Sequence, residues 1–291
     1  MVTTGALLHG DIARHLEFNA SEHPVALQLG GAVPEELASA ARLGEQWGYQ
    51  EINLNCGCPS DRVQNGRFGA CLMSEPQLVR DCLQAMQDAV SIPVTIKHRT
   101  GIDQQNSYSV LRDFVGIVSD SGCEVFIVHA RNAWLQGLSP KENREVPPLH
   151  YDWVYQLKQD FPDLTIVLNG GLTSLADCEA VLPHVDGVML GRAPYQNPWL
   201  LAAVDHVLFA DKARHRTRSD VLEDLIPYIE AMCEDGARLH HMTRHVLGLF
   251  QHQPGGRQFR RHLSENAHRP EADTDTLRAA IALTRRTDQL A

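Results

Sequence analysis

The chain has 291 residues, of which 43% are hydrophobic and 21% charged, and its formal net charge is −10. This composition is typical of a globular protein with a buried core and excludes a disordered chain. The negative charge argues against non-specific attraction of the whole molecule to nucleic acid or acidic lipid. No apolar stretch approaches the roughly 20 residues that span a bilayer, and the first ten residues lack the cationic flank of a signal peptide. We therefore expect a soluble, cytoplasmic, monomeric protein without a membrane partner.

The seven cysteines are an odd number at scattered spacings, which indicates reduced thiols rather than a disulfide framework. The sequence contains neither a Cys-x-x-Cys pair nor a His-Glu-x-x-His motif. We therefore expect no metal site.

Short runs rich in Val, Ile and Leu alternate along the chain with segments of helical spacing. The runs cover residues 25–29, 51–55, 94–97, 125–129, 165–169 and 187–190, and the helical patterns cover residues 34–47, 75–90 and 108–118. Runs with little internal alternation are typical of parallel strands buried on both faces. The repeated order of strand and helix indicates an α/β protein, either a doubly wound sheet or a TIM (β/α)8-type barrel.

A polar side chain ends five of these runs. These residues are Gln28, Asn55, Lys97, His129 and Asn169. A single residue of this kind could have a purely structural role, such as capping a helix or forming a hydrogen bond within a loop. Five together favour the barrel, because barrel enzymes place their chemistry at the carboxyl ends of the strands.

The pattern changes after about residue 210. No strand is predicted from Ser219 onward, and the apolar residues of 221–232 and 239–250 follow helical spacing. We therefore predict a barrel domain over residues 1–210, a linker over 211–218 and a helical domain over 219–291.

The helical domain contains a local excess of positive charge. Residues 236–269 hold six arginines against one acidic residue, Glu265, a sum of +5 that leaves −15 for the rest of the chain. Helical spacing places Arg257, Arg260 and Arg261 on one face. In the alternative interpretation, these arginines only form a solvated helix face. Because guanidinium groups bind phosphate well, the local excess of positive charge favours a polyanion partner.

Two glycine motifs follow the last two predicted strands. They are Asn169-Gly170-Gly171 and Gly191-Arg192. Barrels commonly bind a phosphate at this place through loop amides and a nearby cation. With Lys97 and His129 on the same rim, the pattern suits flavin mononucleotide (FMN), whose ring system needs positive charge near N1 and the C2 carbonyl. In the alternative to a cofactor contact, Lys97 forms an ion pair with a neighbouring acidic residue.

The segment from Glu51 to Met73, which contains Asn55-Cys56-Gly57-Cys58-Pro59, is the most distinctive part of the chain. With the motifs at residues 25–31, 138–145, 168–171, 187–192 and 263–268, it resembles the flavin-dependent tRNA-dihydrouridine synthases, most closely their A-type bacterial subfamily. The resemblance implies FMN-dependent reduction of uridine to 5,6-dihydrouridine in the tRNA D-loop, at positions 20 and 20a, with NADPH as reductant.

The resemblance also implies roles for individual residues. Cys58 would protonate C5 of the uracil while FMN delivers hydride to C6, which agrees with thiols being largely protonated near pH 7. Cys56 and Cys71 are the alternative candidates for the proton donor. The implied FMN contacts are Gln28, Lys97, His129, Asn169, Gly170, Gly171, Gly191 and Arg192, and the implied tRNA contacts are Asn55, Lys141, Arg144, Arg257 and Arg260. The target base would have to be extruded from its stack to reach a barrel mouth.

The chain departs from the family pattern at its start, because residues 1–5 match the end of the family's second strand. We therefore expect an incomplete barrel, six full strands and a stub, that reflects a mis-assigned start or a truncation. Two alternative functions stay open. One is reduction of a free pyrimidine by an FMN barrel, and the other is a catalytically dead, flavin-free tRNA-binding remnant.

Overall fold

The computed structural model describes residues 1–211 and 216–288, with side chains up to residue 284. The chain forms two compact units, one of residues 1–171 and 180–189 and the other of residues 172–179 and 190–291. The predicted linker lies partly outside the described residues, since 212–215 are among those not described.

The first unit is built on a sheet of seven parallel strands in chain order. The strands are β1 (Val2–Thr3), β2 (Ala26–Gly30), β3 (Glu51–Cys56), β4 (Val94–Arg99), β5 (Val125–His129), β6 (Thr165–Asn169) and β7 (Gly187–Met189). The strand predictions are confirmed to within two residues at each end. Within the described part of the chain β1 pairs with β2 alone and β7 with β6 alone, so the sheet has two open edges.

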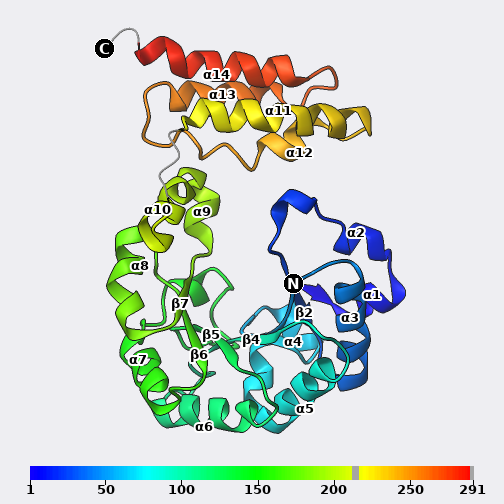
Figure 1. Cartoon of the computed structure of the whole chain (residues 1–291), viewed down its shortest axis with the longest axis vertical. Helices are drawn as coiled ribbons and strands as arrows, with labels where there is room; N and C mark the ends of the chain where they lie inside the picture. Colours follow the sequence, from blue (N-terminus) through cyan, green and yellow to red (C-terminus); the bar gives the residue numbers. More distant parts are fainter. Residues whose placement is uncertain (212–215, 289–291) are drawn as a thin grey trace. The chain divides into compact units, whose positions relative to one another are not determined.

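Helices connect successive strands and run around the outside of the sheet (Figure 1). They are α1 (Thr4–His9), α2 (Ile12–Leu16), α3 (Pro34–Gln46), α4 (Asp61–Asn65), α5 (Pro76–Gln87), α6 (Tyr108–Ser119) and α7 (Tyr151–Asp160), with 3-10 turns η1 (Ala20–Glu22), η2 (Gly69–Ser74), η3 (Glu142–Arg144) and η4 (Leu182–His184). Helix α8 (Leu175–Val181) follows β6 in the chain and belongs mostly to the second unit. The alternation of parallel strands with helices confirms the predicted barrel-type α/β fold.

The two faces of the sheet differ in chemistry. Alternate residues such as Ile52, Leu54 and Ile96 are fully buried and form the apolar layer of the core. The intervening residues, such as Asn53 and Thr95, are also buried, at 4% and 2% exposure, but are polar. Both faces are buried as predicted, yet the strands alternate between apolar and polar residues because they share a polar interior.

The second unit contains the helical C-terminal part of the chain. Its elements are α9 (Arg192–Gln196), η5 (Pro198–Ala203), α10 (Val204–Phe209), α11 (Arg218–Glu234), α12 (Leu239–Thr243), α13 (Gly256–Asn266) and α14 (Thr274–Asp288). Leu222, Ile226, Phe259, Leu263 and Leu277 are almost fully buried in its core. None of the described helices is both long and apolar enough to cross a bilayer.

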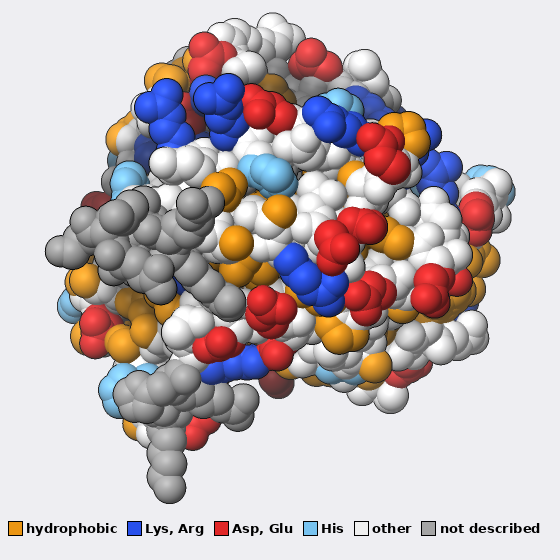
Figure 2. Space-filling model, turned by 90° about the horizontal axis from the view of Figure 1, so that it is seen from above, with side chains coloured by type: hydrophobic (Ala, Val, Ile, Leu, Met, Phe, Trp, Pro, Cys, Tyr) orange, Lys and Arg blue, Asp and Glu red, His pale blue; other side chains and the backbone are white. Residues whose placement is uncertain are grey.

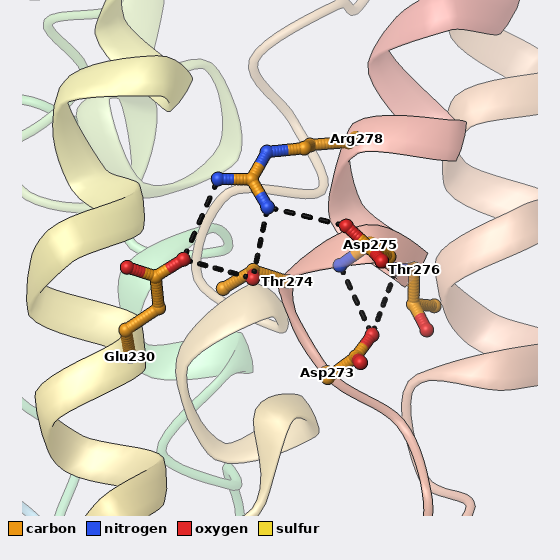
Figure 3. Close-up of polar contacts among 6 residues, drawn as sticks. All are labelled: Glu230, Asp273, Thr274, Asp275, Thr276 and Arg278. Atoms are coloured by element: carbon orange, nitrogen blue, oxygen red, sulfur yellow. Dashed lines mark hydrogen bonds and ion pairs between the residues drawn. The ribbon is translucent and has the colours of Figure 1, made fainter.

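Polar contacts join α11 to α14 beside this core (Figure 3). Arg278 Nη2 lies 3.4 Å from Glu230 Oε1, and the Thr274 hydroxyl donates to the same carboxylate oxygen at 3.1 Å. Asp273 accepts from the backbone N–H groups of Asp275 and Thr276 and so satisfies the free donors at the start of α14. Because the ion pair is about half exposed, its contribution is small beside that of the apolar core.

The apolar residues of 239–250 follow helical spacing, but these residues do not form one continuous helix. Helix α12 ends at Thr243, and the chain continues to Phe250 in turns closed by bonds such as Val246 N–H to Thr243 C=O. The helical spacing was misleading because close packing determines this backbone. A Cβ atom on Gly248 would lie 1.9 Å from the carbonyl oxygen of Gln196, so the chain makes a contact that glycine alone allows.

Candidate active site

The predicted catalytic cysteine lies in a loop directly after β3, and several hydrogen bonds hold this loop. The Asn55 side chain closes it by accepting from the N–H groups of Gly57 and Cys58, each at 3.1 Å. On the other side the carbonyl of Cys58 accepts from Ala70 N–H at 2.9 Å. Gly69 makes this approach possible, since its φ is +77° and a Cβ there would lie 2.6 Å from that carbonyl oxygen.

The three nearby cysteines have different surroundings. Cys56 is completely buried, and burial raises the pKa of its thiol well above the usual range. The Cys71 thiol donates to the Phe68 carbonyl at 3.1 Å, and burial raises its pKa. Cys58 is partly exposed, with its Sγ atom 3.5 Å from the Ser60 hydroxyl. All seven cysteines are free thiols.

Lys97 is a partly buried residue whose ammonium group is desolvated on the polar face of the sheet. Its Nζ atom donates to Asn169 Oδ1 at 2.8 Å, and no described carboxylate pairs with it. Burial, with a smaller contribution from Arg99, lowers the pKa of Lys97 to about 8. The alternative that Lys97 pairs with an acidic residue is therefore not supported. A buried ammonium with two further donors fits a carbonyl or anionic group of a ligand.

His129 ends β5 beside the Gly170 turn. Burial, together with Arg99 and Lys97, lowers the pKa of His129 to about 2, so the imidazole is neutral and can accept or donate one hydrogen bond. A Cβ on Gly170, whose φ is +108°, would lie 2.5 Å from the His129 ring. The Gly170 carbonyl accepts from the Tyr151 hydroxyl at 2.6 Å. The glycine thus lets the chain pass directly over the imidazole.

Arg99 was missed by the sequence reasoning. It is 3% exposed, and its guanidinium donates to three backbone carbonyls, those of Gly57 at 3.1 Å, Asn132 at 3.2 Å and Asn143 at 2.7 Å. Burial lowers the pKa of Arg99 to about 10, while the neighbouring Cys58 acts in the opposite direction. The signal was available, because Arg99 follows Lys97 by two residues and so projects from the same face of β4.

The remaining predicted residues fall into two groups. Lys141 and Arg144 are exposed on the loop after β5, and the buried Asn143 between them bonds to the carbonyls of Trp134, Leu138 and Ser139. Gly191, Arg192, Arg257 and Arg260 belong to the second compact unit. The structure therefore brings together the residues of β2 to β6, and the roles of the second group stay predictions.

Surface charge does not by itself mark a binding site. On the face displayed in Figure 2, arginine and lysine side chains lie among aspartate and glutamate side chains. On α13, Arg261 pairs with Glu265 at 2.8 Å, whereas Arg257 and Arg260 form no ion pair within the described residues. No group of three or more His, Cys, Asp and Glu side chains in residues 1–211 and 216–288 is arranged to hold a metal ion.

The chain is similar to known proteins over nearly its whole length. A family model for dihydrouridine synthase (Dus) matches residues 1–286. The tRNA-dihydrouridine(20/20a) synthase of Vibrio parahaemolyticus is 60% identical over 283 residues, covering 97% of this chain and 86% of that protein. The proteins of the same name from Yersinia pestis and Escherichia coli K12 are 60% and 58% identical over 284 residues, covering 97% of this chain and 82% of each. The chain belongs to the dihydrouridine synthase family.

Proposed function

We propose that the chain reduces uridine to 5,6-dihydrouridine in the D-loop of tRNA, at positions 20 and 20a. The single observation that carries the proposal is the cysteine loop after β3, which Asn55 and Arg99 hold on the same polar face as Lys97. The names of the curated relatives support the choice of substrate and of positions. Such a reaction would take place in the cytoplasm, where tRNA is modified.

The residues of the polar face fit a flavin. Lys97, Asn169 and Gln28 offer donors and acceptors to the polar edge of a ring system, and the unpaired charge of Lys97 suits a group that becomes anionic on reduction. Gly191 and Arg192 would hold the phosphate of FMN. When bound, FMN would supply the hydride to C6 of the uracil and would be re-reduced by NADPH.

The contribution of the protein is to place a thiol proton and to keep the base in position. The Cys58 thiol would deliver its proton to C5 of the uracil, and the Asn55 and Arg99 contacts fix the backbone that carries this thiol. The neutral His129 adds no competing charge to the site. Proton delivery from a fixed position is worth about 10²- to 10⁴-fold in rate.

The tRNA would be held by cations that are exposed or, at Arg260, partly exposed. Lys141 and Arg144 lie on the loop that Asn143 and Arg99 hold, and Arg257 and Arg260 lie on α13. Asn55 is 9% exposed, and its amide is already bonded to Gln28 and to the cysteine loop. In this proposal Asn55 therefore acts on tRNA through the loop that it positions.

Unmodified tRNA incubated with the protein, FMN and NADPH should gain two mass units for each uridine reduced, and so four in a fragment that contains both positions 20 and 20a. The same reaction with free uracil should be at least about 100-fold slower, because free uracil lacks the binding energy of the remaining tRNA. Equal turnover of both substrates would favour the free-pyrimidine alternative. A purified protein that neither binds FMN nor modifies tRNA would favour the flavin-free remnant.

The double variant Arg257→Ala/Arg260→Ala should bind tRNA about 10-fold more weakly at low salt, because each arginine would neutralise a phosphate. The slope of log K against log salt should also become shallower by about 1 to 2. Fluorescence anisotropy with labelled tRNA at several salt concentrations measures both. Arg261→Ala, which removes an arginine already paired with Glu265, is the matched control. An unchanged slope in the double variant would remove these arginines from the binding surface.

A further inference from the structure

The polar face of β2, β3 and β4 carries one continuous chain of side-chain hydrogen bonds. It starts at the backbone of the cysteine loop and ends at a carboxylate at the opposite end of β3. In order, the chain passes through Cys58 N–H, Asn55, Gln28, Asn53, Thr95 and Glu51. The strand register explains it, since Gln28 pairs with Asn53 and Asn53 with Thr95 across neighbouring parallel strands.

Every bond in this chain points the same way. The loop N–H groups donate to Asn55 Oδ1, Asn55 Nδ2 donates to Gln28 Oε1 at 2.8 Å, and Gln28 Nε2 donates to Asn53 Oδ1 at 2.8 Å. A side-chain amide can be turned to exchange its oxygen and its nitrogen, so three amides in sequence do not define a direction by themselves. Groups that act in one sense alone define it at the two ends, because the loop N–H groups only donate and a carboxylate at the other end only accepts.

Glu51 is the acceptor at the far end of the chain. Asn53 Nδ2 donates to Thr95 Oγ1 at 2.8 Å, and the Thr95 hydroxyl donates to Glu51 Oε1 at 2.5 Å. An ionised carboxylate accepts hydrogen bonds and donates none, so it turns the Thr95 hydrogen toward itself and leaves the Thr95 oxygen to accept from Asn53. Thr95 and Asn53 are almost completely buried, which makes an unsatisfied alternative orientation costly.

We propose that Thr95, with Glu51 and Asn53, forms a positioning device that orients the amides of Gln28 and Asn55 and thereby the loop of Cys58. The device presents Asn55 Oδ1 to the N–H groups of Gly57 and Cys58 and presents Gln28 in one orientation to a ligand on the polar face. It rests on the proposed function, because the loop matters for catalysis only if Cys58 delivers the proton. Thr95 itself touches no reacting atom in this proposal.

The variant that tests the device is Thr95→Val, which is nearly isosteric and removes the hydroxyl. Thr95→Ser restores the hydroxyl. The matched control is Thr100→Val, because Thr100 is equally buried at the end of the same strand and its hydroxyl has no partner within the described residues. Two measurements are needed, namely single-turnover uridine reduction in tRNA and hydrogen exchange of the backbone amides of Gly57 and Cys58 in the protein without flavin.

We expect Thr95→Val to slow the single-turnover rate about 10-fold, the equivalent of one lost hydrogen bond of about 1.4 kcal/mol, with tRNA affinity unchanged within about twofold. Loop amide exchange should accelerate by a similar factor. Thr95→Ser and Thr100→Val should stay within about threefold of the wild type in both measurements. The loss is partial because Arg99 still holds the Gly57 carbonyl.

The proposal would be overturned if the loop amides exchanged equally fast in Thr95→Val and in Thr100→Val. It would also be overturned if Thr95→Val accelerated this exchange as much in an Asn55→Ala background as in the wild type. In that background the chain is already broken, so Thr95→Val should have little further effect. Should Thr95→Val fail to fold, Glu51→Leu serves instead, because leucine has no acceptor for the Thr95 hydroxyl, and exchange of the loop amides is again expected to accelerate. Failure of the proposed function is distinguishable, because the wild type would then not reduce uridine in tRNA, whereas exchange of the loop amides in Thr95→Val would still accelerate.

Discussion

Replacing Cys58 with alanine should lower the rate of dihydrouridine formation by about 10²- to 10⁴-fold, the range for loss of a positioned general acid. The variant keeps the loop bonds, because Asn55 and Arg99 bind the backbone of the loop rather than the thiol. Binding of flavin and of tRNA should therefore stay within about threefold of the wild type. Single-turnover reduction with pre-reduced enzyme isolates the chemical step from flavin re-reduction.

Cys71→Ala is the matched control for this variant. Cys71 lies in η2 against the cysteine loop, but its thiol donates to the Phe68 carbonyl. Its replacement should leave the single-turnover rate within about threefold. A Cys58→Ala variant with the wild-type rate would exclude Cys58 as the proton donor. A Cys71→Ala variant with the larger loss would move that role to Cys71.

Replacing Lys97 with methionine should have two opposite effects. Flavin affinity should fall about 10- to 100-fold, because a buried charged donor is lost from the polar face. The protein without flavin should become more stable by about 2 kcal/mol near neutral pH. A pKa lowered from 10.5 to about 8 means that the charged Lys97 costs the folded protein about 3 kcal/mol of stability, which the variant regains. The variant also loses the hydrogen bond to Asn169, which lowers its stability by about 1 kcal/mol.

The pH dependence follows from the sign of this shift. Between pH 8 and 10.5 unfolded Lys97 binds a proton that folded Lys97 has released, so this group makes the wild type more stable as the pH rises through that window. The stability advantage of Lys97→Met should therefore be largest below pH 8 and shrink toward pH 10.5. Comparing the two proteins at each pH cancels the titration of the buried thiols, which both contain.

Urea unfolding of the two flavin-free proteins at several pH values measures the stability difference, and flavin titration measures the affinity. Lys158→Met is the control, because Lys158 is a lysine of the same unit that already pairs with Asp186 at 2.9 Å. That variant should leave flavin affinity unchanged and should not become more stable. Unchanged flavin affinity in Lys97→Met would remove Lys97 from the cofactor site.

Local sequence pattern was sufficient for most of the secondary-structure elements. The strand runs, the helix that begins at Pro34 and the helical C-terminal part all appear where periodicity and helix-start residues predicted them. Periodicity failed at residues 244–250, where the contact of Gly248 with the Gln196 carbonyl, and not the local pattern, determines the backbone. Contacts between residues about 50 positions apart leave no periodic signal.

The sequence by itself determined that polar side chains end the strands of a barrel-type sheet and that a cysteine lies among them, because parallel strands bring their carboxyl ends to one edge. The tertiary structure alone decided how those side chains bond to one another. Arg99 contacts three carbonyls from two separate loops, those after β3 and β5, and Thr95 reaches the Cys58 loop through three amides on two neighbouring strands. Such partners depend on strand register and burial, which are set only when distant segments pack together.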